Sequence, residues 1–213
     1  MKVKVTIGIL GLQGDIEENM TVAKGALEHM KVRGTVKAVR YSEEFENIDG
    51  LILPGGESTV MSNLIAIQGG TLQTIKRRIS NGMPTMGTCA GMIMLSKRAY
   101  DRVVGETRQQ LMHNLDIVVE RNAFGRQNDS FEANLEISIL GSGTFRGIFI
   151  RSPIVREVGI GVDQIAKFEN NVVAVKQKNV IGTAFHPELA GDDRLHRHFI
   201  KMVIEFKKKC SQQ

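Results

Sequence analysis

The stretch Pro84-Thr85-Met86-Gly87-Thr88-Cys89-Ala90-Gly91-Met92-Ile93-Met94-Leu95 holds one of the chain's two cysteines between small residues. Residues 84–86 predict a short buried strand, and residues 91–95 have the apolar side chains of a helix packed on a sheet. Cys89 therefore falls on a sharp strand-to-helix bend, which displays its side chain. The amide of Ala90 can donate to a developing oxyanion. We predict that Cys89 is a nucleophile; the alternative is a buried structural cysteine.

Upstream of this bend, strands and helices alternate. Hydrophobic periodicity predicts strands over residues 3–10, 35–39 and 50–53, and helices over residues 15–31, 59–67 and 70–80. This order is typical of a parallel sheet with helices on both faces, whose sites form at the carboxyl ends of the strands. Three glycine-marked loops fall at such ends, at residues 11–14, 55–56 and 87–91.

The second half of the chain has a different pattern. Short apolar or alternating runs between glycine and asparagine turns predict mostly antiparallel strands over residues 117–120, 135–140, 144–150, 154–158, 164–168 and 172–177. A further strand over residues 180–185 leads to His186-Pro187-Glu188, and a helix is expected over residues 192–209. The fold class predicted is α/β.

Composition narrows the class of protein. The 213 residues are 42% hydrophobic with no linker-like stretch, so we expect a single domain over residues 1–213. Two cysteines cannot make a disulfide framework, which favours a reducing cytoplasm. No signal peptide is evident and no apolar run approaches the roughly 20 residues of a membrane span. With 28 basic against 23 acidic residues, no Trp and two Tyr, nucleic-acid binding is not expected.

A catalytic cysteine needs a base, and the sequence offers five histidines. His186 is the candidate, because its strand delivers it to the same sheet edge as Cys89 and Glu188 can orient its ring. The alternative for this tripeptide is an exposed turn stiffened by Pro187. Surface roles are expected for His113, His196 and His198, and a solvated or core-edge position for His29.

The segment Leu53-Pro54-Gly55-Gly56-Glu57-Ser58-Thr59 supplies a third element of the site. Paired glycines let backbone amides approach a ligand, so Gly56 is a candidate for the oxyanion hole together with Ala90. Glu57 and Ser58 are candidates for recognising polar ends of a substrate. Ser58 can alternatively cap the helix that follows, and the two roles are compatible.

These motifs, in this order, resemble the triad-type (class I) glutamine amidotransferases. Further segments narrow the resemblance to the family of glutaminase subunits of pyridoxal 5'-phosphate synthase, over residues 5–206. The segments that carry it are Gly8-Ile9-Leu10-Gly11-Leu12-Gln13-Gly14-Asp15, residues 51–59, Gly87-Thr88-Cys89-Ala90-Gly91, residues 119–127, Phe149-Ile150-Arg151 and Phe185-His186-Pro187-Glu188-Leu189.

The resemblance implies a flavodoxin-like three-layer α/β/α sandwich that hydrolyses L-glutamine to L-glutamate and ammonia. Cys89 would form a thioester, with His186, held by Glu188, moving protons. The implied glutamine-binding residues are Gly56, Glu57, Ser58, Arg121, Ile150 and Arg151, and Arg126 is a weaker candidate. For Arg121 and Arg151, side-chain chemistry supports the role that the resemblance implies, since a guanidinium can bind an α-carboxylate bidentately.

The resemblance also implies a partner: a barrel-shaped synthase subunit, in a large hetero-oligomer, that receives the ammonia. Gln13 is the candidate for contact with it, and neither a cofactor nor a metal is expected. Three departures from the family pattern, Asp15, Ala123 and His198, are expected to lie away from the triad. The alternatives are a glutaminase subunit of another pathway, a different thiol hydrolase and a non-catalytic regulatory subunit.

Overall fold

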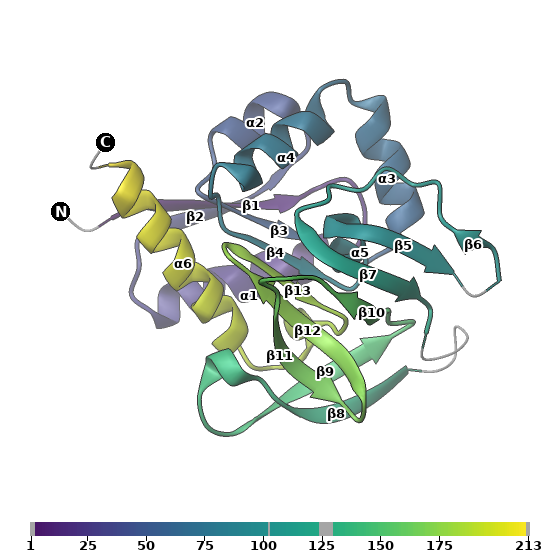
Figure 1. Ribbon diagram of the computed structural model, residues 1–213. Coiled ribbons are helices and arrows are strands. Elements are labelled where there is room, and N and C mark those ends of the chain that lie inside the picture. The colour runs from purple at the N-terminus through teal and green to yellow at the C-terminus, as the bar shows by residue number, and fades with distance from the viewer. Residues whose placement is uncertain (1–2, 102, 124–129, 212–213) are drawn as a thin grey trace.

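The computed structural model describes residues 3–101, 103–123 and 130–211 (Figure 1). Its first part alternates strands and helices: β1 (Val5–Leu10), α1 (Ile16–His29), β2 (Gly34–Val39), α2 (Ser42–Glu46), β3 (Gly50–Leu53), α3 (Ser58–Ile67), α4 (Thr71–Ser80), β4 (Thr85–Thr88) and α5 (Ala90–Leu95).

The second part is richer in strands: β5 (Ser96–Asp101), β6 (Gly105–Glu106), β7 (Leu115–Arg121), β8 (Ser130–Glu136), β9 (Thr144–Ile150), β10 (Ile154–Val158), β11 (Asp163–Phe168), β12 (Asn171–Gln177) and β13 (Val180–Thr183). Two 3₁₀ helices, η1 (Ser138–Leu140) and η2 (Pro187–Leu189), and the last helix α6 (Arg194–Cys210) complete it.

One large sheet runs through both parts in the order β2-β1-β3-β4-β13-β12-β10-β7-β5-β6, with β11 paired to β12. The strands from β2 to β13 are parallel, and most pairings beyond β13 are antiparallel. Helices α2, α3 and α4 lie on one side of the sheet and α1 and α6 on the other (Figure 1). The predicted α/β class with a mainly parallel sheet and added antiparallel strands is confirmed.

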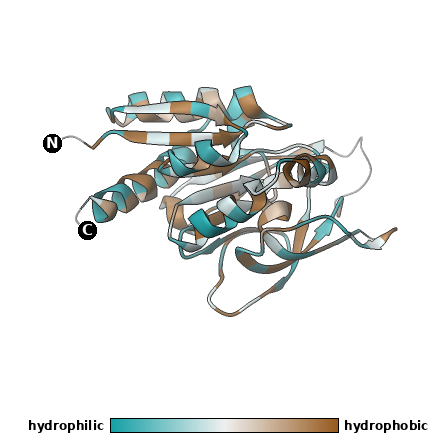
Figure 2. Ribbon diagram, turned by 90° about the horizontal axis from the view of Figure 1, so that it is seen from above, coloured by the Kyte–Doolittle hydropathy of each residue, from teal (hydrophilic) through white to brown (hydrophobic). Residues whose placement is uncertain are grey.

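The core forms where apolar strand residues meet the inner faces of the helices. Helix α6, which ends near the label C, alternates brown and teal residues along its length, and its buried face includes Leu195, Phe199 and Val203 (Figure 2). Burying such side chains stabilises the fold by about 1.5–3 kcal/mol each. Among the described helices, none combines the length and the apolar character needed to cross a bilayer.

The structure differs from the expected elements in several places. The strand expected over residues 135–140 lies earlier in the chain, because β8 runs from Ser130 to Glu136 and residues 138–140 form η1. The helix α2 and the strands β5 and β6 were not expected; β5 begins directly after α5 and pairs in parallel with β7. The sequence of β5 does not read as a strand because it is mostly polar: only Ser96 and Ala99 are buried, and the two residues between them are charged and exposed.

Candidate active site

Cys89 lies at the bend between β4 and α5. Its φ of 47° and ψ of −103° place it in a backbone conformation that L-residues seldom adopt, and its N–H donates to the Thr183 carbonyl at 2.7 Å. The bend packs so closely against β3 that a Cβ atom on Gly91 would lie 2.1 Å from the Leu53 carbonyl oxygen. Such strain persists only where the surrounding structure imposes it, as at a displayed nucleophile. The side chain is 6% exposed.

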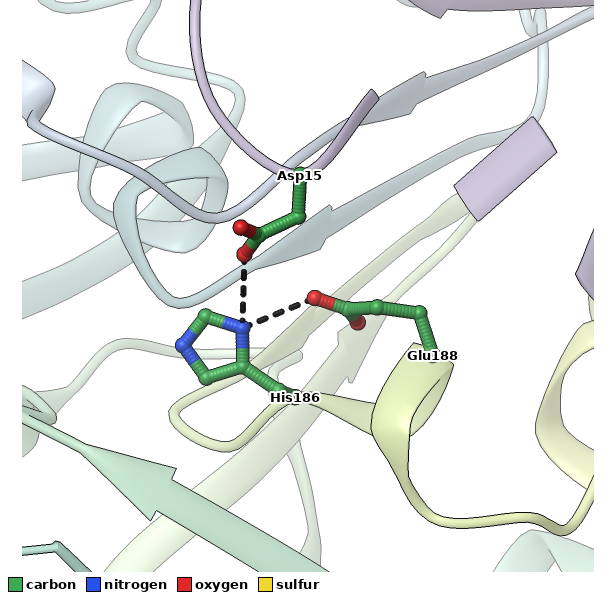
Figure 3. Close-up of side chains that lie close together, drawn as sticks. All are labelled: Asp15, His186 and Glu188. Atoms are coloured by element: carbon green, nitrogen blue, oxygen red, sulfur yellow. Dashed lines mark hydrogen bonds and ion pairs between the residues drawn. The ribbon is translucent and has the colours of Figure 1, made fainter. Parts of the chain in front are cut away.

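His186 follows β13, which is the parallel neighbour of β4, with Thr183 opposite Thr88. The backbone N–H of His186 donates to the Ile148 carbonyl at 2.8 Å, which ties this residue to β9. The Nδ1 atom lies 2.8 Å from Oε1 of Glu188 and 3.0 Å from Oδ2 of Asp15 (Figure 3). Two carboxylates, from Glu188 and Asp15, therefore contact the same ring nitrogen.

The electrostatics of this cluster favour a protonated ring. Burial alone would lower the pKa of His186, but the contacts of Nδ1 with Asp15 and Glu188, together with the nearby Cys89, outweigh it and raise the pKa to about 12. Burial raises the pKa of Glu188, although the hydrogen bond with His186 acts to lower it. For the more exposed Asp15, the hydrogen bond with His186 is the larger effect and its pKa is lowered. An imidazolium here stabilises negative charge on the neighbouring sulfur.

The contact of Asp15 with His186 corrects one expectation. Asp15 was expected to be a departure remote from the triad, yet its carboxylate reaches the ring of the predicted base. The available signal was its place in the glycine-marked loop after β1, at the same sheet edge as Cys89. Donor atoms of Asp15, His186 and Glu188 lie within 4.8 Å of one another and are of metal-binding types, but separations of 2.8 and 3.0 Å are hydrogen-bond distances.

A cavity of about 140 Å³ opens at the bend. It is smaller than the roughly 300–1,000 Å³ of pockets that take drug-sized ligands, so it suits a substrate about the size of one amino acid. Most of the residues that the sequence suggested line it: Gly56, Glu57, Ser58, Cys89, Arg121, Ile150, Arg151 and His186. Ile93, Asn122 and Leu189 also line it and were not expected. A cavity of about 690 Å³ lies elsewhere, beside α6.

Opposite charges face each other inside this cavity. Arg121 donates through Nη2 to Oε1 of Glu57 at 2.8 Å and through Nη1 to Oγ1 of Thr59 at 3.0 Å. The Arg121 side chain is 14% exposed and that of Glu57 is 40% exposed, so the arginine is the shielded partner of the pair. A cation and an anion side by side match a ligand that carries both a carboxylate and an ammonium group.

Other candidates are placed differently from the sequence expectations. Ser58 does not cap α3, since Glu57 holds the N-cap position; its hydroxyl donates to Oε1 of Gln109 at 3.2 Å. His196 was expected at the surface but is fully buried. Arg126 lies outside the described residues.

The remaining predicted residues sit around the cavity wall. Ala90 is the first residue of α5, directly after the nucleophile candidate. The Ile150 carbonyl lies 3.9 Å from Sγ of Cys89 and accepts its S–H. Gln13 accepts the backbone N–H of Glu57 at 2.9 Å through Oε1, so the loop after β1 holds the segment that follows β3.

Comparison with known proteins places these features in a family. Residues 9–205 match the model of the SNO glutamine amidotransferase family. Two relatives are each named pyridoxal 5'-phosphate synthase subunit PdxT. That of Nitrosopumilus maritimus is 43% identical over 94% of this chain and 98% of its own length. That of Pyrococcus furiosus is 45% identical over 94% of this chain and 100% of its own length.

Solved structures agree with the sequence relatives. A crystal structure of a glutamine amidotransferase superposes with a TM-score of 0.79 at 40% identity, and covers 92% of this chain and 98% of the other. The PurLQS structure from Thermotoga maritima has a TM-score of 0.62 at 14% identity, covers 97% of this chain and 99% of the other, and shows likeness of fold alone.

Proposed function

This chain belongs to the SNO glutamine amidotransferase family, and we propose that it hydrolyses L-glutamine to L-glutamate and ammonia as the glutaminase subunit of a pyridoxal 5'-phosphate synthase. The observation that carries the proposal is the small cavity in which Cys89 and His186 meet the Glu57–Arg121 pair. A thiol and a base provide acyl transfer, and the charged pair provides recognition of an amino acid. The relatives' names supply the pathway.

The reaction divides between three side chains. The sulfur of Cys89 attacks the side-chain amide carbon of glutamine, while amides of Gly56 and Ala90 stabilise the oxyanion. His186 gives a proton to the leaving nitrogen, so that ammonia departs and a thioester remains. His186 then takes a proton from water, whose oxygen attacks the thioester and releases glutamate. Glu188, 2.8 Å from Nδ1, orients the ring throughout.

Recognition of the amino-acid end falls to the opposite side of the cavity. Arg121 and Arg151 bind the α-carboxylate, and Glu57 binds the α-ammonium group. When substrate enters, its two charges take the places of the Glu57–Arg121 contact. Ser58 and Ile150 complete the binding residues along the cavity wall.

The ammonia is passed to a barrel-shaped synthase subunit within a large hetero-oligomer, with Gln13 at the contact. The chain acts as a single glutamine amidotransferase domain over residues 1–213, in the cytoplasm, with no cofactor of its own. The names of the relatives support the synthase as partner, since each is a subunit of pyridoxal 5'-phosphate synthase.

The test combines the protein with a synthase partner, glutamine, a pentose phosphate and a triose phosphate, and follows formation of pyridoxal 5'-phosphate. A Cys89→Ala variant should lose glutamine-dependent synthesis, and added ammonium should restore it. Glutamine-dependent synthesis by this variant would show that the assigned nucleophile is wrong. Glutamine hydrolysis without any support of synthesis by the wild type would exclude this pathway.

A further inference from the structure

Asp15 was not expected in the site, yet its carboxylate contacts the His186 ring (Figure 3). Asp15 holds the N-cap position of α1, where an Asp side chain ordinarily accepts a backbone N–H of the helix. Here the side chain makes no capping hydrogen bond. Its carboxylate turns instead toward His186 and is 35% exposed at the cavity wall.

The backbone around Asp15 is arranged for this contact. The N–H of Asp15 donates to the Gly55 carbonyl at 3.1 Å, which docks the loop after β1 on the segment after β3. A Cβ atom on Gly55 would lie 2.3 Å from Cε1 of His186 and 2.6 Å from Oδ2 of Asp15. The two side chains meet only because position 55 has no side chain.

We propose that Asp15 is a second carboxylate partner of His186, sharing the single Nδ1 proton with Glu188 and positioning the ring together with it. Asp15 is thus a positioning residue of the reaction, and this role rests on the proposed glutaminase function. The two carboxylates are unequal: Glu188 has a fully buried side chain, whereas Asp15 faces the cavity. Asp15 keeps a negative charge more easily, because water reaches it.

The pKa of the His186 ring depends on the charged and titratable groups that face it. They are Asp15 from the loop after β1, Cys89 from the bend and Glu188 from η2. Glu57, Arg121 and Arg151 line the same cavity. Of these groups, Asp15 can be neutralised without removing the nucleophile, the base or the buried carboxylate.

The first test measures the ring directly in the full chain. Between about pH 6 and about pH 11, NMR of the His186 ring should show a wild-type ring that stays largely protonated and an Asp15→Asn ring that loses its proton, because loss of an adjacent opposite charge lowers the titration midpoint by about 1–3 units. A His186→Gln variant assigns the resonance. Glu18→Gln, which neutralises an exposed acid in the first turn of α1, is the matched control.

The second test uses glutaminase activity in complex with the synthase. In Asp15→Asn, the alkaline limb of the plot of kcat/KM against pH should move to lower pH, by as much as the titration midpoint of the His186 ring. Asp15→Glu should reverse part of this shift. The Asp15→Asn/Glu188→Gln double variant should lose more activity than the product of the two single losses, since each carboxylate then has no substitute.

These outcomes separate this proposal from the proposed function. A His186 titration in Asp15→Asn equal to that of the Glu18→Gln control would overturn the role of Asp15. So would independent losses in the double variant. Absence of glutaminase activity in the wild-type complex would instead contradict the proposed function, while the NMR titration would still decide the role of Asp15.

Discussion

His196 has no exposed surface on α6, and neither of its ring nitrogens has a hydrogen-bond partner among the described residues. Burial lowers its pKa to about 4, so the ring is neutral in the folded protein at neutral pH. His186, only ten positions earlier, has a pKa raised by its partners. Two histidines of one chain thus differ in charge because one ring has carboxylates beside it and the other has none in contact.

The buried His196 should make the fold sensitive to acid. Its folded pKa lies below the ordinary 6.5, so the unfolded chain binds the extra proton and stability falls as pH drops from about 6.5 toward 4. Between pH 7 and pH 5 we expect this group to cost about 2 kcal/mol. Urea unfolding at both pH values should show a smaller loss for His196→Leu. The exposed His113→Asn should behave as the wild type; an unchanged acid loss in His196→Leu would refute this explanation.

Arg121 should show itself in substrate binding. Arg121→Lys keeps the charge but loses the planar fork that matches a carboxylate, so KM for glutamine should rise about 10- to 100-fold, with a smaller effect on kcat. Steady-state glutaminase assays with the synthase present measure both. Arg98→Lys changes an exposed arginine paired with Glu106 and is the control. A fall in kcat with unchanged KM would contradict a binding role.

At the scale of elements, the sequence located the alternating strands and helices of the first part but not every side-chain contact. Periodicity indicated β3 and β9 with their observed bounds, because each is a short apolar or alternating run between glycine turns. The same reasoning missed α2, β5 and β6, because their sequences are mostly polar and few of their residues are buried. The contact of Asp15 with His186 depends on two loops that meet in space, which local pattern does not encode.

The bend at Cys89 should be the least tolerant element. Gly91→Ala would place a methyl group 2.1 Å from the Leu53 carbonyl, a backbone atom that cannot move without disturbing β3. We expect a loss of at least about 1–3 kcal/mol, the usual range for overpacking. Thermal unfolding compares this variant with Gly25→Ala, whose added methyl group meets nothing within 4 Å inside α1. The control should be about 0.5–1 kcal/mol more stable than the wild type. Equal stability of Gly91→Ala and the wild type would refute the tight bend.

At the scale of the whole molecule, the site is assembled from both parts of the chain. The first part provides Cys89 and the loops after β1 and β3, while β9 and β13 bring Ile150 and His186 from the second part. Phe149 of the two-stranded β8–β9 sheet packs against Phe185 at 5.7 Å between ring centroids, which fixes that sheet beside His186. Any partner that moves one of these loops can therefore alter the geometry of the reaction.

Gln13 is the residue through which such a movement would reach the proposed oxyanion hole, because its Oε1 accepts the N–H of Glu57 next to Gly56. We expect Gln13→Ala to lower synthase-stimulated glutaminase activity about tenfold, equivalent to about 1.4 kcal/mol in the barrier. Ammonium-driven synthesis by the same complex should be unchanged, since the synthase is intact. Gln73→Ala, an exposed glutamine on α4, is the control. Full stimulated activity in Gln13→Ala would show that the partner acts on the site by another route.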